Sequence, residues 1–131
     1  MPYRVMLVDD DDRISELLSR ALGDMGYEVG RLEDGETALE ALRADPPDLL
    51  FLDIYLPKLG GLEVLHAMRV EGIPTPVITM SGLPDEQMAR DSLALGASDF
   101  ISKPFDLRKL EEHLKPTLEA LGVWPGGKSA G

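Results

Sequence analysis

The sequence predicts one α/β domain in which five parallel strands alternate with five helices. Short apolar runs alternate with segments of helical periodicity along most of the chain, a pattern typical of a parallel sheet covered by helices on both faces. The apolar runs also lack the polar alternation of strands that face water on one side. The length of 131 residues fits a single domain of this kind.

The first strand and helix have clear boundaries. Arg4–Val8 is an apolar run without helical period, and we expect it to be a strand. Arg13–Leu22 places its apolar residues at helical spacing and is expected to be a helix. Asp11 or Asp12 can cap the start of this helix, and Gly26 lies at its end.

A polar strand, a helix and a strongly apolar strand follow. Tyr27–Leu32 is the most polar of the strand candidates. Glu36–Arg43 repeats the helical period, and Pro46 and Pro47 stop it. Asp48–Leu52 is too apolar for a strand that faces water on one side, so we expect it near the centre of the sheet.

The second half of the chain completes the alternation. Its elements are a helix over Leu62–Val70, a strand over Pro76–Met80, a helix around Asp85–Leu95, a strand over Ala97–Ser102 and a helix from Asp106. Pro116 falls inside the last helical pattern, and we expect it to kink or shorten that helix because proline has no backbone N–H to donate.

The strand patterns also predict a topology. A strand order of 2-1-3-4-5 places the polar second strand at an edge and the apolar third strand at the centre. This is the flavodoxin-like doubly wound arrangement, with right-handed crossovers and a topological switch point between strands 1 and 3. We assign residues 1–121 to the domain, and the Gly- and Pro-rich residues 122–131 to a flexible tail or linker stub.

Composition excludes several classes of function. The formal net charge of -11 disfavours direct binding to nucleic acid or to anionic membranes. The absence of cysteine excludes disulfides, thiol catalysis and cysteine-ligated zinc. The two histidines, His66 and His113, lack the spacing of metal ligands. The N-terminal residues match neither a signal peptide nor a membrane span, so we expect a cytoplasmic protein.

Polar residues gather where the predicted strands end. The first strand runs into Asp9–Asp12, the third into Asp53, the fourth into Ser81 and the fifth into Lys103. In open α/β sheets the ligand site lies beyond the carboxyl ends of the strands. The residues next to the predicted switch point are therefore carboxylates.

Carboxylates that meet there need a compensating positive charge. Two unit charges about 4 Å apart repel by roughly 1 kcal/mol in water and about 4 kcal/mol near a protein surface. Lys103 supplies one positive charge, and a divalent cation would supply two. Carboxylate ligands that leave room for water and a phosphoryl oxygen suit Mg²⁺. A carboxylate beside Mg²⁺ and a lysine is also a plausible nucleophile toward phosphorus.

Four segments of the chain resemble the receiver domain of two-component response regulators. They are VDDDD at Val8–Asp12, FLDIYLPKLGGLEVL at Phe51–Leu65, PVITMSG at Pro76–Gly82 and GASDFISKPF at Gly96–Phe105. No single segment is decisive, but together they have the order and spacing of the family over roughly residues 3–121.

The resemblance implies a role for each acidic residue. Asp53 would be the residue that a histidine kinase or a histidine phosphotransfer protein phosphorylates. Asp10 would bind Mg²⁺ directly, and Asp9 would act mainly through water. The backbone carbonyl of Tyr55 would complete the coordination by the protein.

The resemblance also implies a switch. Ser81 would take a phosphoryl oxygen on activation, and Lys103 would pair with the phosphoryl group. The Lys103–Pro104 peptide would be cis. Phe100 occupies the aromatic switch position, where tyrosine is more usual, and its inward turn would alter the face formed by the fourth helix, the fifth strand and the fifth helix.

The partners implied are a kinase or phosphotransfer protein, and either a downstream protein target or an output domain outside this chain. The first helix could dock the phosphotransfer partner, although we expect most of its apolar stripe to be core (Ile14, Leu17, Leu18, Ala21). The predicted switch face shows no clear pattern of complementary charges, so we expect a monomer or a weak phosphorylation-dependent dimer.

Two other functions compete with this interpretation. A phosphatase of similar topology would need a second acid–base aspartate shortly after Asp53, but Ile-Tyr-Leu-Pro follows instead. A pseudo-receiver that acts only through protein contacts would usually lack part of the set formed by Asp9, Asp10, Asp53, Ser81 and Lys103. Solvated helix caps are the ordinary role of adjacent aspartates, and we assign that role to Asp11 and Asp12.

Overall fold

The computed structural model describes residues 2–82, 86–103 and 105–125. Within these residues five strands and five helices alternate, as predicted, and their ends differ from the predicted ends by a few residues. In chain order they are β1 (Arg4–Val8), α1 (Asp12–Met25), β2 (Glu28–Leu32), α2 (Gly35–Ala44), β3 (Leu49–Asp53), α3 (Gly61–Val70), β4 (Val77–Ser81), α4 (Glu86–Ala94), β5 (Asp99–Ser102) and α5 (Leu107–Ala120).

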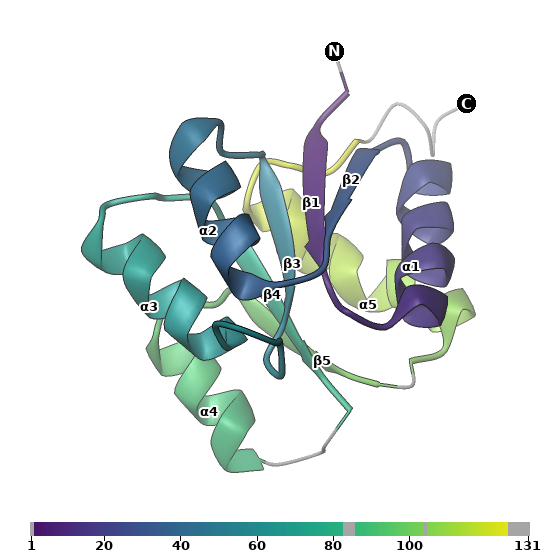
Figure 1. Cartoon of the computed structure of the whole chain (residues 1–131). Coiled ribbons are helices and arrows are strands. Elements are labelled where there is room, and N and C mark those ends of the chain that lie inside the picture. Colours follow the sequence, from purple (N-terminus) through teal and green to yellow (C-terminus); the bar gives the residue numbers. More distant parts are fainter. Residues whose placement is uncertain (1, 83–85, 104, 126–131) are drawn as a thin grey trace.

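The strands form one parallel sheet in the order β2-β1-β3-β4-β5, which confirms the predicted topology. The polar strand β2 lies at an edge, and β3 lies at the centre with all five of its residues buried. Figure 1 shows α1 and α5 on one face of the sheet and α2, α3 and α4 on the other.

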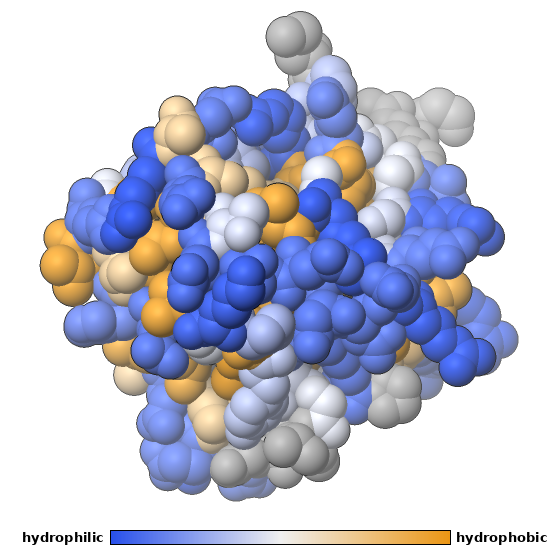
Figure 2. Space-filling model, in the orientation of Figure 1, coloured by the Kyte–Doolittle hydropathy of each residue, from blue (hydrophilic) through white to orange (hydrophobic). Residues whose placement is uncertain are grey.

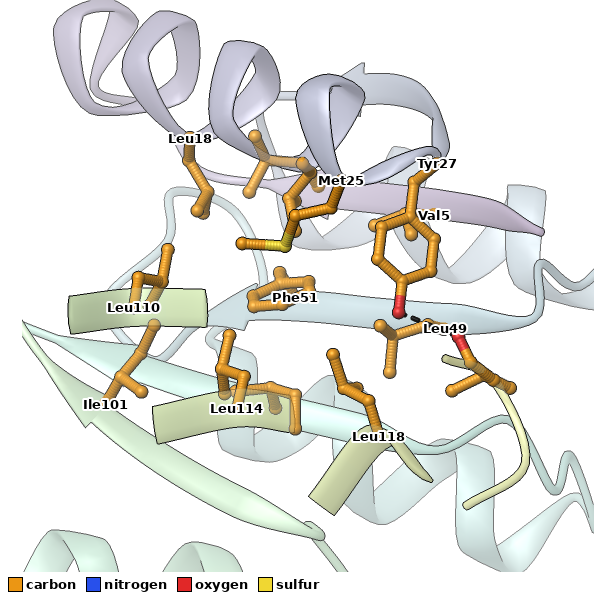
Figure 3. Packing of buried hydrophobic residues seen from close by; sticks show 14 of the residues in the cluster. Val5, Leu18, Met25, Tyr27, Leu49, Phe51, Ile101, Leu110, Leu114 and Leu118 are labelled. Carbon is orange, nitrogen blue, oxygen red and sulfur yellow. Dashed lines mark hydrogen bonds between the residues drawn. The ribbon is translucent and has the colours of Figure 1, made fainter. Parts of the chain in front are cut away.

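Each face of the sheet has its own hydrophobic core, because successive strand residues point to opposite faces. On β1, Val5 and Leu7 belong to the core under α1 and α5, whereas Val8 belongs to the core under α2 and α3. Figure 3 shows Phe51 of β3 between the side chains of α1 and those of α5. Deleting a buried side chain of this size costs about 3 to 5 kcal/mol, so these layers hold the strand ends in place.

Helix α1 begins and ends as the sequence indicates. The Asp11 carboxylate accepts hydrogen bonds from the backbone N–H groups of Arg13 and Ile14, at 3.0 and 3.1 Å. Gly26 ends the helix in the left-handed conformation, with a φ of 110°. Asp11 is therefore the cap of this helix, one of the two candidates.

The prediction that most of the apolar stripe of α1 is core was wrong. The buried line of the helix is formed by Ser15, Leu18, Leu22 and Met25. Leu17 lies on the solvent side of this line and is 42% exposed, and Ile14 and Ala21 are half-buried. Part of the apolar surface of α1 is thus available to a partner.

Helix α5 continues past Pro116 to Ala120, so the proline does not end it. The chain then packs back onto the domain: Val123 is buried, and its carbonyl accepts a hydrogen bond of 2.7 Å from the Tyr27 hydroxyl. The Lys115 ammonium lies 5.6 Å from the centre of the Trp124 ring. Residues 126–131 of the predicted tail lie outside the described residues.

The visible surface is mainly polar. In Figure 2 hydrophilic residues cover most of the face shown, and the hydrophobic residues between them lie in separate small areas. Within the part of the chain that the structure describes, no helix has the length and apolar character that crossing a bilayer requires.

Candidate phosphoryl-acceptor and metal site

The polar residues predicted at the strand ends lie together at one edge of the sheet. Asp9 follows β1 directly, Asp53 is the last residue of β3, Ser81 is the last residue of β4, and Lys103 follows β5. Strands β3 and β4 each extend one residue beyond the predicted end, because Asp53 is in register with Met80 and Ser81 with Ser102. Asp53 and Ser81 are therefore held by the sheet itself rather than by a loop.

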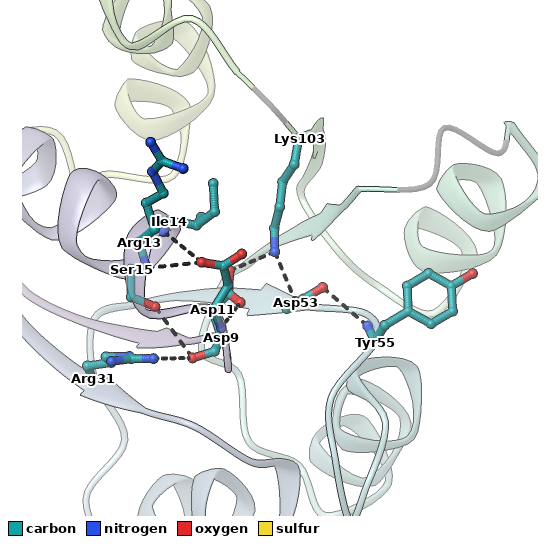
Figure 4. A network of polar contacts seen from close by, with 9 residues as sticks. All are labelled: Asp9, Asp11, Arg13, Ile14, Ser15, Arg31, Asp53, Tyr55 and Lys103. Carbon is teal, nitrogen blue, oxygen red and sulfur yellow. Dashed lines mark hydrogen bonds and ion pairs between the residues drawn. The ribbon is translucent and has the colours of Figure 1, made fainter.

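The carboxylates of Asp9 and Asp53 and the ammonium group of Lys103 meet at the centre of the site (Figure 4). The Nζ atom of Lys103 lies 2.7 Å from Oδ2 of Asp9 and 3.0 Å from Oδ2 of Asp53. Asp9, Asp10 and Asp53 each present a carboxylate oxygen within 4.8 Å of the other two. The compensating charge expected from the sequence is thus in direct contact with two of the three carboxylates.

Burial sets the protonation behaviour of the site. Asp9 is wholly buried, Asp53 is 5% exposed and the Lys103 side chain is 12% exposed. Burial raises the pKa of Asp53 to about 6, an effect that the negative charge of Asp9 adds to and that the ion pair with Lys103 opposes. Burial alone would lower the pKa of Lys103, but the contacts with Asp9 and Asp53 outweigh it and raise that pKa.

Backbone groups orient both buried carboxylates. Oδ1 of Asp53 accepts a hydrogen bond of 3.2 Å from the backbone N–H of Tyr55, and Oδ1 of Asp9 accepts one of 2.9 Å from the N–H of Asp11. Each carboxylate therefore has one oxygen fixed by the main chain and one paired with Lys103. This arrangement fixes the acidic groups without using all of their oxygen lone pairs.

Asp10 and Asp53 border an open pocket of about 420 Å³. Its lining includes Asp10, Asp53, Gly82 and Lys103. The donor set consists of oxygen atoms with a high negative charge, which suits a hard divalent cation such as Mg²⁺. The pocket leaves space beside the carboxylates for water or a phosphoryl group.

The other predicted site residues lie around this cluster or outside the described residues. Ser81 is buried at the end of β4, and its carbonyl accepts a hydrogen bond of 2.8 Å from the N–H of Lys103. Phe100 is half-buried and lines a groove of about 370 Å³ between β5 and α5. Figure 4 shows the Tyr55 ring directed away from Lys103. The predicted cis peptide involves Pro104, which lies outside the described residues.

The sequence did not reveal how closely α3 approaches β3 at this site. A Cβ atom on Gly61 would lie 2.1 Å from the carbonyl oxygen of Asp53, and the Gly61 N–H donates to the carbonyl of Ile54 at 2.8 Å. Only a residue without a side chain fits between this helix and the strand that carries Asp53.

Replacing Gly61 with alanine is therefore expected to lower the free energy of unfolding by about 3 kcal/mol, since backbone atoms must move to admit the methyl group. Gly23→Ala is the matched control: Gly23 lies in α1 with open space around its Cβ position, and this change should stabilise the protein by about 0.5 to 1 kcal/mol. Urea unfolding of both variants checks this. Equal effects of the two changes would contradict the close approach at Gly61.

Comparison with known proteins identifies the family. The model of the response regulator receiver domain matches residues 5–115. This chain belongs to that family. It is a signalling domain of two-component response regulators and not a metabolic enzyme, and phosphorylation and Mg²⁺ binding are typical of the family.

Two relatives illustrate the similarity. The chain is 36% identical over 118 residues to the response regulator MprA of Mycolicibacterium vanbaalenii, a match that covers 90% of this chain and 51% of MprA. It is also 36% identical over 118 residues to the alkaline phosphatase synthesis transcriptional regulatory protein PhoP of Bacillus subtilis, covering 90% of this chain and 49% of PhoP. The chain thus spans about half the length of these relatives.

Solved structures agree with the fold. The receiver domain of NtrX from Brucella abortus is 34% identical with a TM-score of 0.79, covering 88% of this chain and 98% of that chain. The receiver domain of the Francisella response regulator 1452 is 26% identical with a TM-score of 0.81, covering 90% and 98%.

Proposed function

We propose that this receiver domain accepts a phosphoryl group on Asp53 from a phosphohistidine of a sensor histidine kinase or a phosphotransfer protein, with Mg²⁺ bound beside it. The observation that carries this proposal is the cluster of Asp9, Asp10 and Asp53, in which Lys103 pairs with Asp9 and Asp53. An open pocket lies beside Asp10, Asp53 and Lys103. The reaction needs both negative and positive groups, because the acceptor carboxylate must be nucleophilic while the incoming phosphoryl group is anionic.

The metal would be held by oxygen atoms of Asp9, Asp10, Asp53 and the Tyr55 backbone carbonyl. When bound, Mg²⁺ supplies positive charge opposite the phosphoryl oxygens. Asp10, which is exposed, would supply a direct ligand, while Asp9, which is wholly buried and paired with Lys103, would act mainly through water. The donor chemistry of this set is that of a magnesium site.

Phosphoryl transfer requires the ionised form of Asp53. A carboxylate oxygen of Asp53 attacks phosphorus, a new O–P bond forms, and the N–P bond of the phosphohistidine breaks with its electron pair left on the imidazole nitrogen. The Lys103 ammonium, 3.0 Å from Oδ2 of Asp53, then pairs with the phosphoryl oxygens on which the negative charge resides. The product is an aspartyl phosphate.

Ser81 and Phe100 would transmit this change. Ser81 lies at the end of β4, the strand next to β3. From there its hydroxyl would donate a hydrogen bond to a phosphoryl oxygen. Phe100 of β5 is in register with Thr79 of the same strand β4, so a shift of β4 reaches the groove between β5 and α5. The face formed by α4, β5 and α5 would then bind a downstream protein target or an output domain.

The phosphodonor would dock on α1 and α5. A groove of about 380 Å³ lies there, lined by Leu17 and Ala21 of α1 and Leu107 of α5, among others.

Leu17→Glu should therefore slow phosphotransfer from a histidine phosphotransfer protein at least tenfold, because it places a charge in an apolar contact. The same change should leave transfer from a small acyl phosphate unchanged. Val70→Glu is the control, since Val70 is 72% exposed at the end of α3. Equal loss with both donors would contradict docking at Leu17.

The proposed function is tested by incubating the protein with Mg²⁺ and a small acyl-phosphate donor and recording its intact mass. We expect one phosphoryl adduct that a chelator prevents. The absence of an adduct would favour the alternative of a non-phosphorylated pseudo-receiver. Light scattering of the phosphorylated protein should show a monomer or a weak dimer.

A further inference from the structure

Arg31 connects the edge of the sheet to the acidic site. It belongs to β2 (Glu28–Leu32), where it is in register with Leu7 of β1. An arginine on a polar edge strand would ordinarily extend into solvent. The Arg31 side chain is instead only 28% exposed and reaches toward the loop that leads from β1 into α1 (Figure 4).

The guanidinium group contacts Asp9 in that loop, Asp12 at the start of α1 and Glu33 just after β2. Its Nη2 atom donates a hydrogen bond of 3.1 Å to the backbone carbonyl of Asp9. Its Nη1 atom lies 2.8 Å from Oδ1 of Asp12, and Nη2 lies 3.3 Å from Oε1 of Glu33. The planar fork of arginine allows one side chain to hold a carbonyl and two carboxylates at once.

The carbonyl that Arg31 holds belongs to the peptide between Asp9 and Asp10. Because a peptide unit is planar, a hydrogen bond that fixes this oxygen also fixes the direction of the bond from the peptide nitrogen to the Cα atom of Asp10. The Ser15 hydroxyl donates to the same oxygen at 3.4 Å, and the Asp9 N–H donates to the carbonyl of Leu32 at 3.1 Å. The backbone of Asp9 is thus tied to both β2 and α1.

The position of the Asp10 carboxylate depends on the backbone more than that of the Asp9 carboxylate does. The Asp9 carboxylate is fixed by the N–H of Asp11 and by Lys103. Asp10 is exposed, and among the described residues its carboxylate has no such hydrogen bond or ion pair. The peptide that Arg31 holds therefore constrains the point from which the Asp10 side chain extends.

We propose that Arg31 is a positioning residue that orients the Asp9–Asp10 peptide so that the Asp10 carboxylate faces the metal site. This inference rests on the proposed Mg²⁺ site and adds a residue that makes no contact with the metal. A purely electrostatic role would have the opposite sign, because removing a positive charge near the carboxylates should strengthen cation binding. The Arg31 charge is already offset by Asp12 and Glu33, so we expect the loss of positioning to prevail.

The test compares Arg31→Met and Arg31→Lys with the wild type and with Arg4→Met. Arg4 is the matched control, since it lies at the other end of β1, is paired with Asp45 and is far from the site in the strand register. The Asp10 backbone amide resonance is recorded by NMR in the metal-free proteins and during Mg²⁺ titration. Groups that orient metal ligands typically contribute about 10- to 100-fold in metal affinity.

We expect Arg31→Met to weaken Mg²⁺ binding about tenfold, and to shift or broaden the metal-free Asp10 amide signal while the core signals remain. Arg31→Lys should also weaken binding, because it keeps the charge but loses the fork. Arg4→Met should match the wild type. Unchanged or tighter binding in Arg31→Met would overturn the proposal. If the wild type itself binds no Mg²⁺, the proposed metal site fails, and the metal-free Asp10 signal alone decides: a change in Arg31→Met but not in Arg4→Met supports positioning, and no change overturns it.

Discussion

Replacing Asp53 with asparagine is expected to raise the free energy of unfolding of the metal-free protein by about 3 kcal/mol at pH 8. Burial raises the pKa of the Asp53 carboxyl from 3.8 to about 6, and each pKa unit corresponds to about 1.4 kcal/mol. The raised pKa means that the folded protein is relatively stabilised when Asp53 is protonated. This stabilisation is complete below about pH 4 and is lost as the pH rises through about 6. Asparagine avoids that loss.

Urea unfolding in the presence of a chelator, at pH 8 and below pH 4, measures this effect. The advantage of Asp53→Asn over the wild type should be largest at pH 8 and should shrink toward zero below pH 4. Asp24→Asn serves as the control, since Asp24 is exposed on α1. An equal difference at both pH values, or a loss of stability at pH 8, would show that burial of an ionised Asp53 does not cost the fold free energy.

Replacing Lys103 with methionine should have the opposite sign. Lys103 is the positive partner of the buried carboxylates of Asp9 and Asp53, at 2.7 and 3.0 Å. Removing one partner of a buried ion pair leaves uncompensated charge and typically costs about 3 to 5 kcal/mol. We expect a destabilisation of about 3 kcal/mol at pH 8, smaller at pH 5, where protonation of Asp53 relieves the repulsion.

A double-mutant cycle isolates this interaction. Asp53→Asn should stabilise the Lys103→Met protein by more than it stabilises the wild type, because in Lys103→Met it also removes one of the two charges left unpaired. Added Mg²⁺ should restore part of the stability lost in Lys103→Met, since a ligand that binds only the folded state stabilises that state. Lys109→Met is the control, because Lys109 is exposed on α5. Additive effects of the two changes would contradict a direct coupling between Lys103 and Asp53.

The sequence predicted the layout of the sheet because burial leaves a local signal. The continuous apolar character of β3 indicated a central strand, and the polar character of β2 indicated an edge. The carboxylates followed from this layout, since parallel strands deliver their carboxyl ends to one edge of a sheet. The exact ends of β3 and β4 did not follow, because pairing of Asp53 and Ser81 with neighbouring strands extends each strand by one residue.

Features that depend on how closely distant segments of the chain approach each other were not predicted. The sequence did not indicate that the backbone of Gly61 packs against the carbonyl of Asp53. Arg31 looked like a charged residue of a polar strand, yet it reaches the Asp9 carbonyl from the edge of the sheet. On α1, the periodic apolar residues did not reveal that Leu17 is turned outward, because the rotation of a helix on its sheet is set by the packing of the whole layer.

The most direct test of the central claim is to identify the residue that carries the phosphoryl group. Borohydride reduces an aspartyl phosphate to homoserine, so peptide mass mapping of the reduced protein, phosphorylated with Mg²⁺ and a small acyl-phosphate donor, locates the modified position. We predict homoserine at Asp53 alone, lost when a chelator is present and absent from Asp53→Asn. Homoserine at Asp9 or Asp10 in the wild type, or no homoserine in a protein that shows a phosphoryl adduct, would contradict the assignment of Asp53 as the acceptor.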